Sequence, residues 1–223
     1  MKERGMIFNG EMVRAILDGR KTQTRRVMKP QPDPCPAPRG GHWWPSNAFK
    51  TMLHVEEEMQ NNKGGWGGLV GDACPFGDVG DLIWVRETFG WQIRRDPLGG
   101  TGEFRVYRAT TPDAVRYQTA SGEAAPMKWV PSIHMPRRAS RITLEITDVR
   151  VERLNNISYD DAISEGIKQE WTCIDPGLGS YAHKNDVQDD YETLWKSIYG
   201  EESWAANPWV WVIEFKRVEG GAA

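Results

Sequence analysis

A short stretch near the amino terminus concentrates side chains that can bind anions. Residues 19–26 contain four cations and two hydroxyls, packed directly behind one glycine. A β-type alternation places Lys21 and Arg25 on one side and Thr24 and Arg26 on the other. A turn from helix to strand needs only the glycine, so the other side chains must serve a second purpose. They could contact a polyanion locally, or they could form a basic strand exposed to water.

The preceding residues predict the elements that position this stretch. Gly5–Phe8 is typical of a short opening strand. Glu11–Asp18 places apolar residues on one helical face, and Asn9 is a suitable cap for that helix. Gly19 can end the helix in the left-handed conformation that glycine adopts at little cost. We therefore expect a strand, a helix and then a second strand that begins inside the basic stretch.

Three motifs together resemble a known family. The pattern IL-x-G-R-K-T-x-T-x-R at residues 16–26 resembles the signature of the ASCH domain, a small β-barrel related to the PUA fold. With GDLIWVRE at residues 80–87 and NPWVWVIEF at residues 207–215, the chain resembles the longer ASCH-type proteins of bacteriophages and prophages. The resemblance also covers most of Arg141–Val218 but not the segments between these motifs.

The resemblance implies a catalytic site. Small bacterial enzymes of the ASCH group hydrolyse the amide of N(4)-acetylcytidine with a lysine, a threonine and a glutamate. The first two correspond here to Lys21 and Thr24. The glutamate lies in a short helix of the type [ST]-x-x-x-A-x-x-E, which matches residues 158–165 and assigns it to Glu165. The resemblance implies neither a metal nor another cofactor.

These residue types suit amide hydrolysis, which needs a nucleophile, a base and a group that holds the developing oxyanion. The Thr24 hydroxyl is a weak acid, so a base must lie within about 3 Å of it. On an ideal strand Lys21 lies on the opposite side, so the turn at Gly19 must bring it towards Thr24. Neighbouring arginines lower the pKa of Lys21 and Glu165 raises it, which leaves the net direction open. Arg20 and Arg26 are the expected substrate contacts, and Arg26 is a candidate for the oxyanion or a phosphate.

Two further charged pairs are candidate substrate contacts. Arg86 and Glu87 close the strand predicted at residues 80–87, where they could reach the pocket or form an ion pair at the strand end. Arg137 and Arg138 precede the strand predicted at Arg141–Leu154. They could clamp a phosphate, because arginine forks match phosphate oxygens, or they could be an exposed pair.

A second function fits the same residues. PUA-like barrels bind nucleic acid, so the chain could be a non-catalytic reader of RNA, DNA or a modified base, with tryptophans as stacking platforms. An interaction protein of phage origin is a third hypothesis. The expected partner is thus a modified nucleoside or a nucleic acid, without a membrane. The sequence defines neither the acyl group nor the oligomeric state.

The expected fold is α+β: a PUA-like/ASCH β-barrel with a few short helices and long loop insertions. One domain over residues 1–223 is expected, with insertions at about 28–78, 93–136 and 168–186. The prolines of Val27–Asn47 predict an extended segment outside any sheet, because proline cannot donate to a ladder. Arg141–Leu154 predicts a long strand with a slip near Asp148, and helices are expected at Asn156–Ile167 and Asp189–Tyr199.

Composition restricts the possible partners and the cellular compartment of the protein. The formal net charge of −3 gives no overall attraction for a polyanion, so any nucleic-acid contact must be local. Three cysteines without a CxxC pair fit a reducing cytoplasm, that of the bacterial host if the protein is phage-encoded. No apolar run is long enough for a membrane span. Four side chains could in principle gather around zinc, although their spacing matches no compact ligand pattern: Cys35, His42, His54 and Cys74.

Overall fold

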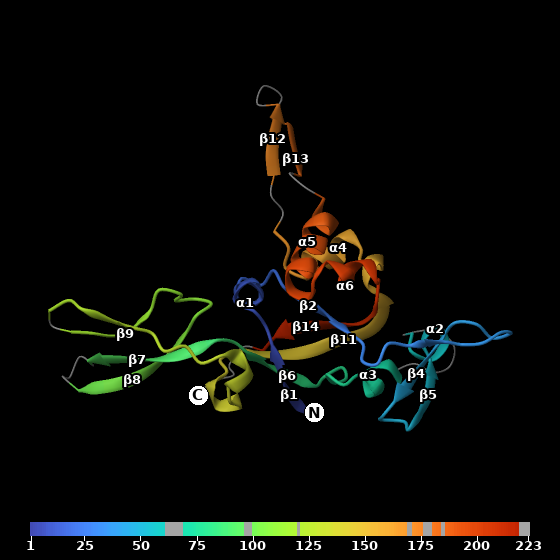
Figure 1. Cartoon of the computed structure of the whole chain (residues 1–223), viewed down its shortest axis with the longest axis horizontal. Coiled ribbons are helices and arrows are strands. Elements are labelled where there is room, and N and C mark those ends of the chain that lie inside the picture. Colours follow the sequence, from blue (N-terminus) through green and yellow to red (C-terminus); the bar gives the residue numbers. More distant parts are fainter. Residues whose placement is uncertain are drawn as a thin grey trace. The chain divides into compact units, whose positions relative to one another are not determined.

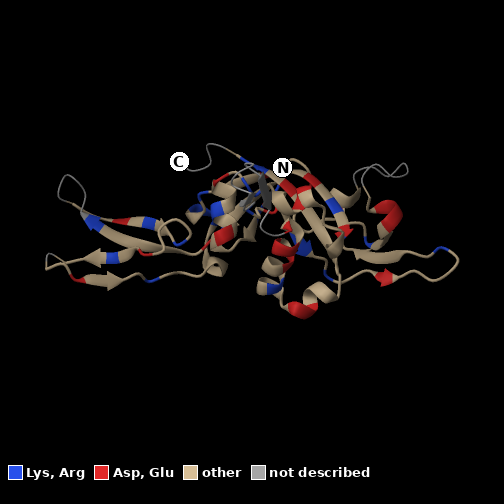
Figure 2. Cartoon of the chain, turned by 90° about the horizontal axis from the view of Figure 1, so that it is seen from above, with Lys and Arg blue, Asp and Glu red and all other residues tan. Residues whose placement is uncertain are grey.

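The computed structural model describes residues 1–60, 69–95, 100–119, 121–168, 171–175, 180–183 and 186–218 (Figure 1). The chain divides into two compact units, where the sequence predicted one domain. The first unit comprises Met1–Asp18, Leu82–Glu145 and Arg217–Ala223, and the second comprises Gly19–Asp81 and Ile146–Lys216. Positions of basic residues and of acidic residues alternate along the ribbon (Figure 2).

In the first unit, two parallel strands lie beside the start of a long one. Strand β1 (Glu3–Ile7) pairs in parallel with β6 (Leu82–Arg86), so that Ile7 lies opposite Arg86. Strand β6 pairs on its other side with the first residues of β11 (Thr143–Arg153), antiparallel, with Leu144 opposite Ile83. Helix α1 (Gly10–Leu17) follows β1 and begins at Asn9, whose side chain accepts a hydrogen bond from Met12 N. This cap confirms the sequence prediction.

The remainder of the first unit consists of hairpins and 3₁₀ turns. Strands β7 (Phe89–Arg95) and β8 (Thr101–Tyr107) form one antiparallel pair, and β9 (Val115–Gln118) and β10 (Ala124–Pro126) form another. The 3₁₀ turns are Ser132–His134 and Arg137–Ala139. A small core holds this region together, with Phe89, Met135 and Ala139 buried against Tyr107 and Val130.

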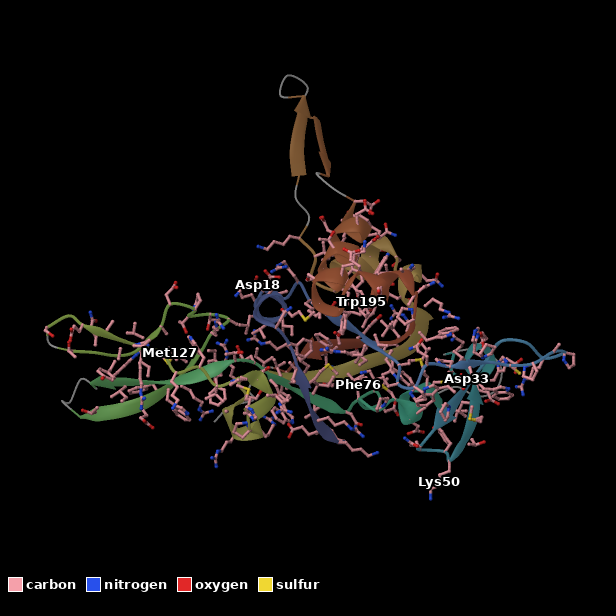
Figure 3. All side chains as sticks on the ribbon, viewed as in Figure 1. Asp18, Asp33, Lys50, Phe76, Met127 and Trp195 are labelled. Atoms are coloured by element: carbon pink, nitrogen blue, oxygen red, sulfur yellow. The ribbon has the colours of Figure 1, made fainter. Side chains whose placement is uncertain are left out.

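In the second unit, helices cover one face of an antiparallel sheet. Strand β14 (Trp209–Arg217) pairs with β2 (Gln23–Val27), so that Val212 lies opposite Arg25 and Ile213 opposite Thr24. Helices α4 (Tyr159–Ser164), α5 (Val187–Tyr199) and α6 (Glu201–Ala205) lie over these strands (Figure 1). Their buried residues share a core with Val210 and Val212, and Trp195 lies among the helices (Figure 3).

Local sequence signals explain where these helices begin. Ser158 accepts a hydrogen bond from Asp161 N while the Asp161 side chain accepts one from Ser158 N, which is a complete capping box for α4. Asp186 caps α5 in a similar way through Gln188 N. A 3₁₀ turn at Leu154–Asn156 joins β11 to α4. The predicted helices at Asn156–Ile167 and Asp189–Tyr199 are therefore confirmed.

The regions predicted as loop insertions contain strands. Strands β3 (Asp33–Pro34), β4 (His42–Ser46) and β5 (Thr51–His54) form a three-stranded sheet, followed by the short helices α2 (Val55–Glu58) and α3 (Leu69–Ala73). The turn between β4 and β5 carries Lys50 at its tip (Figure 3). Strands β12 (Trp171–Asp175) and β13 (Ser180–His183) form a hairpin. Residues 61–68 of the first predicted insertion lie outside the described residues.

The prediction that prolines keep residues 27–47 out of any sheet was wrong. Pro34 pairs with His42 and Pro45 pairs with Met52. Proline removes one donor but keeps its carbonyl, so a short antiparallel strand tolerates it where that donor is not needed. The described strands close no barrel, because the five-stranded order β1-β6-β11-β14-β2 leaves β1 and β2 with one strand neighbour each. The fold is thus mixed α/β with strand-rich cores, without the barrel that was expected.

Candidate functional site

The basic stretch enters the second unit through a glycine turn. Gly19 has a φ of 75°, the left-handed conformation predicted for it. Two backbone hydrogen bonds then anchor Thr22: its N–H donates to Ser164 O of α4 at 2.8 Å, and its carbonyl accepts from Phe215 N of β14 at 2.8 Å. These bonds fix the backbone of Lys21 next to the end of α4.

Lys21 and Glu165 form a buried ion pair. Lys21 Nζ lies 2.6 Å from Glu165 Oε2 and also donates to the Glu165 carbonyl at 2.9 Å. The exposed fraction of the side chain is 0% for Lys21 and 3% for Glu165. Glu165 caps the carboxyl end of α4, where the helix dipole disfavours a carboxylate. Two cations, Lys21 and Arg25, face the Glu165 carboxylate and offset this unfavourable position.

Burial lowers the pKa of Lys21 below its ordinary value of 10.5. The charges of Arg26 and Arg25 lower it further, whereas the Glu165 carboxylate opposes the shift through its charge and its hydrogen bond. The sequence left the direction of this balance open. Loss of water around the ammonium is the largest contribution, so the neutral amine becomes available at a lower pH than for an exposed lysine.

Arg25 is the second cation on the same carboxylate. Its Nη1 lies 3.5 Å from Glu165 Oε1, and its Nη2 lies 3.2 Å from Glu152 Oε2 and 3.1 Å from Asp161 Oδ2. The Arg25 side chain is 0% exposed. Lys21, just before β2, and Arg25 of β2 thus present two buried cations to Asp161 of α4, its cap residue Glu165 and Glu152 of β11.

Arg150 of β11 extends this network. It lies 2.7 Å from Asp161 Oδ1, donates to Gln23 Oε1 at 3.1 Å, and pairs with Glu152 and Glu214. Burial opposes the charge of Arg150, but these carboxylates dominate and raise its pKa. Burial likewise opposes ionisation of Asp161, and the charges of Arg25 and Arg150 reverse this and lower its pKa. The opposite charges of Arg150 and Asp161 therefore favour the ionised form of each other.

Tyr191 of α5 lies in the field of the same carboxylate. It is only 3% exposed, and burial followed by the charge of Glu165 raises its pKa well above 10. The phenol therefore stays protonated at every pH at which the protein would work. The sequence predicted Tyr191 only as part of a helix face.

The Thr24 side chain points away from Arg25. Successive side chains of a strand leave on opposite faces, and Arg25 shares its face with Val212 and the helices. Thr24 lies opposite Ile213 and is 1% exposed. Among the described residues its hydroxyl forms no hydrogen bond with Lys21 or Glu165. The structure thus brings Lys21 and Glu165 together, while the predicted role of Thr24 stays a prediction.

The other predicted substrate contacts have protein partners. Arg20 Nη1 donates to Gly166 O at 2.7 Å, and Arg26, on the face of Thr24, is half-buried. In the first unit, Arg86 Nε donates to the carbonyl of Ser132 at 3.2 Å, and Arg137 lies 2.6 Å from Glu3.

Glu87 and Arg138 complete the set predicted from the sequence. Glu87 is 2% exposed and accepts two bonds from Arg141, at 2.9 and 3.0 Å. Arg138 is exposed, and its carbonyl accepts a bond from Arg105. Sequence reasoning missed Arg141 and Arg150, because Arg141 precedes β11 and Arg150 is one of five charged residues along that strand, so neither stands out in the pattern.

The four metal candidates do not gather. No three ligand-type side chains form a metal-binding group in the part of the chain that the structure describes. His54 Nε2 lies 2.9 Å from Gly40 O, and His42 pairs with Glu56 at 2.6 Å. Neither Cys35 nor Cys74 takes part in a disulfide among the described residues.

Comparisons with known proteins return no match: no protein-family model, no curated protein and no solved structure is similar to this chain. No helix among the described residues is long and apolar enough to cross a membrane.

Proposed function

We propose that the second unit hydrolyses the amide of an N(4)-acylated cytosine nucleoside and that it is a divergent relative of the ASCH, PUA-like proteins. The observation that carries the proposal is the contact between Lys21 Nζ and Glu165 Oε2, 2.6 Å apart and almost fully buried. These residues are 144 positions apart in the sequence, where only the family resemblance connects them.

Lys21 is the proton-transfer group of the proposed reaction. Its lowered pKa favours the neutral amine, which can accept a proton from the attacking hydroxyl. The attack forms a tetrahedral carbon with an oxyanion. Its collapse breaks the bond between the acyl carbon and N4, and the lysine returns the proton to N4. If water attacks, this step gives the carboxylic acid and the cytosine nucleoside directly. If a threonine hydroxyl attacks, the nucleoside leaves first, and one water then hydrolyses the acyl ester on the protein to release the acid and restore the hydroxyl.

Glu165 positions the lysine in this scheme. Its side-chain and main-chain oxygens both accept from Nζ, which directs the nitrogen and holds its protonated form after each transfer. Arg25 Nη1 lies 3.5 Å from the other carboxylate oxygen and brings a second positive charge to it. The network therefore restrains the one group that must change protonation.

The attacking oxygen belongs either to Thr24 or to a water molecule, and experiment separates the two cases. The resembled enzymes use a threonine, but here that side chain projects from the face of β2 opposite Arg25. A water molecule held by Lys21 could take its place. Thr24→Ala abolishes hydrolysis if the hydroxyl attacks, and preserves most of it if water does.

One observation favours hydrolysis over a non-catalytic reader of nucleic acid. Reading a phosphate backbone needs cations that are open to solvent, because the contact works by neutralising phosphate charge. Lys21 and Arg25 are 0% exposed at their side chains and are paired with carboxylates. Two of the four cations of residues 19–26 therefore form ion pairs inside the protein and cannot contact a phosphate backbone.

The test is incubation of the purified full chain with N(4)-acetylcytidine and chromatographic detection of cytidine. Release of cytidine is expected, with loss in Lys21→Ala and retention in Lys50→Ala, an exposed lysine of the same unit. Glu165→Gln should reduce turnover. Protein that is inert but retards labelled RNA in a gel would reject the hydrolase and support the reader.

A further inference from the structure

The first unit contains a cavity at the ends of its two parallel strands. Its volume is about 410 Å³, and Glu87, Thr88 and residues 7–10 contribute to its wall. Strands β1 and β6 end side by side here, since Ile7 lies opposite Arg86 and Phe8 N donates to Arg86 O at 3.1 Å. The carboxyl ends of neighbouring parallel strands are where open α/β sheets bind ligands. Every described residue that lines this cavity belongs to the first unit.

Two arginines face the cavity without a carboxylate partner among the described residues. Arg14 of α1 donates from Nη1 to Ala109 O at 3.0 Å, which holds its guanidinium against the wall. A Cβ at Gly10 would lie 3.6 Å from that nitrogen, so the side chain folds back over the start of the helix. Arg108 is placed by its backbone, whose N–H donates to Thr88 O at 2.9 Å.

The charge balance of the wall favours an anion. Glu87 is the carboxylate of the wall, and Arg141 neutralises it through two bonds of 2.9 and 3.0 Å. The charges of Arg14 and Arg108 have no carboxylate partner among the described residues, so an anionic ligand can pair with both. Thr88 and Ser132 add hydroxyl donors that suit phosphate oxygens.

Glu87 also provides acceptors. A carboxylate has about four lone-pair sites, and Arg141 occupies two of them. A hydroxyl group of a ligand can use the remaining sites. A volume of about 410 Å³ lies within the range of small-molecule pockets and exceeds the need of a lone phosphate ion.

We propose that this cavity binds a small phosphate monoester that carries hydroxyl groups, with the phosphate on Arg14 and Arg108 and a hydroxyl on Glu87. A monoester has a charge of about −2 above its second pKa of about 6, which matches the two arginines. The proposal does not depend on the function assigned to Lys21.

The experiment is calorimetric titration of the full chain with ribose 5-phosphate, with inorganic phosphate and with ribose. Saturable one-to-one binding of ribose 5-phosphate is expected, weaker binding of inorganic phosphate, and none of ribose. Arg14→Gln and Arg108→Gln should each weaken the Kd about tenfold, since each removes a charged hydrogen-bond partner. The affinity should fall at pH 5, where the ester carries about one charge.

Two control variants test whether the binding belongs to this cavity. Arg116→Gln removes an exposed arginine of the same unit that does not line the cavity, and should leave the Kd unchanged. Lys50→Ala, at an exposed lysine of the second unit, should also leave it unchanged. If Arg14→Gln does not fold, Arg108→Gln carries the test, because its exposed side chain has no partner among the described residues.

Three results would overturn the proposal. The first is no saturable binding of either phosphate probe up to about 10 mM. The second is wild-type affinity in Arg108→Gln. The third is inorganic phosphate binding as tightly as ribose 5-phosphate, which would reject the contact between Glu87 and a ligand hydroxyl.

Discussion

Arg25 Nη1 lies 3.5 Å from Glu165 Oε1, on the carboxylate whose other oxygen lies 2.6 Å from Lys21 Nζ. One buried anion therefore faces two buried cations from neighbouring positions of the same segment. Removing any member leaves an imbalance that water cannot screen. This arrangement makes both the proposed chemistry and the stability of the second unit sensitive to single substitutions.

The first prediction concerns the pH dependence of hydrolysis. If neutral Lys21 accepts the proton, kcat/KM rises with pH and levels off above the lysine pKa, which lies below 10.5 because of burial. The midpoint is read from kcat/KM for N(4)-acetylcytidine between pH 5 and pH 10. A profile that is flat across this range would remove Lys21 from the proton-transfer role.

The second prediction concerns coupling between Lys21 and Glu165. Glu165→Gln leaves both cations facing a neutral amide and should lower the free energy of unfolding by about 3–5 kcal/mol. Lys21→Met leaves the carboxylate with Arg25. The double variant should lose less stability than the sum of the two single variants, because each single change already breaks the pair. Urea unfolding measures all three, and strict additivity would contradict a direct interaction.

The third prediction concerns acid stability through Asp161. Because the pKa of Asp161 is lowered from 3.8, its contribution is present above the unfolded pKa and is lost as pH falls through the folded pKa. Asp161→Asn should therefore cost about 1 kcal/mol at pH 7, allowing for solvent screening, and less as the pH drops below 3.8. Urea unfolding at a series of pH values measures this dependence.

Asp160→Asn is the matched control for that measurement. Both residues lie in the first turn of α4 and share the favourable interaction with the helix dipole. Only Asp161 lies within 3.1 Å of Arg25 and 2.7 Å of Arg150. Equal losses in the two variants would show that the arginine contacts add nothing.

The fourth prediction concerns the turn at Gly19. A Cβ there meets no atom within 4 Å, so the cost of Gly19→Ala is purely conformational and should be about 1–2 kcal/mol. Gly19→Asn should cost less, because asparagine tolerates this backbone conformation. Thermal unfolding gives the values. Gly10→Ala serves as the reference, since its Cβ would make only ordinary contacts from 3.6 Å, and an equal loss there would mean that the left-handed backbone is not the cause.

Structural features that depend on a few neighbouring residues were predictable from the sequence. Asn9, Gly19 and Ser158 each perform the capping or turn function expected of their residue type. The slip expected near Asp148 also agrees with burial, because the buried positions shift from Leu144 and Ile146 to Val149 and Val151. These features depend on local hydrogen bonding and side-chain alternation, which the sequence displays directly.

Features that depend on distant partners were not predictable in the same way. The pairing of Pro45 with Met52 depends on a hairpin whose composition resembles a loop. Arg150 bridges Glu152, which strand alternation places on its own face, to Asp161 and Glu214, which no spacing rule connects to it. The pairing of Lys21 with Glu165 was anticipated through a family resemblance, but no local pattern indicated that Arg25 would share the carboxylate.

The division of the chain has a consequence for its synthesis on the ribosome. The first unit consists of residues 1–18, 82–145 and the segment from Arg217, and the second consists of Gly19–Asp81 and Ile146–Lys216. Strand β11 changes unit between Glu145 and Ile146 without leaving its extended conformation. Neither unit can therefore be excised as one continuous fragment, and the opening strand must wait for Leu82–Arg86 to be translated before it gains its parallel neighbour.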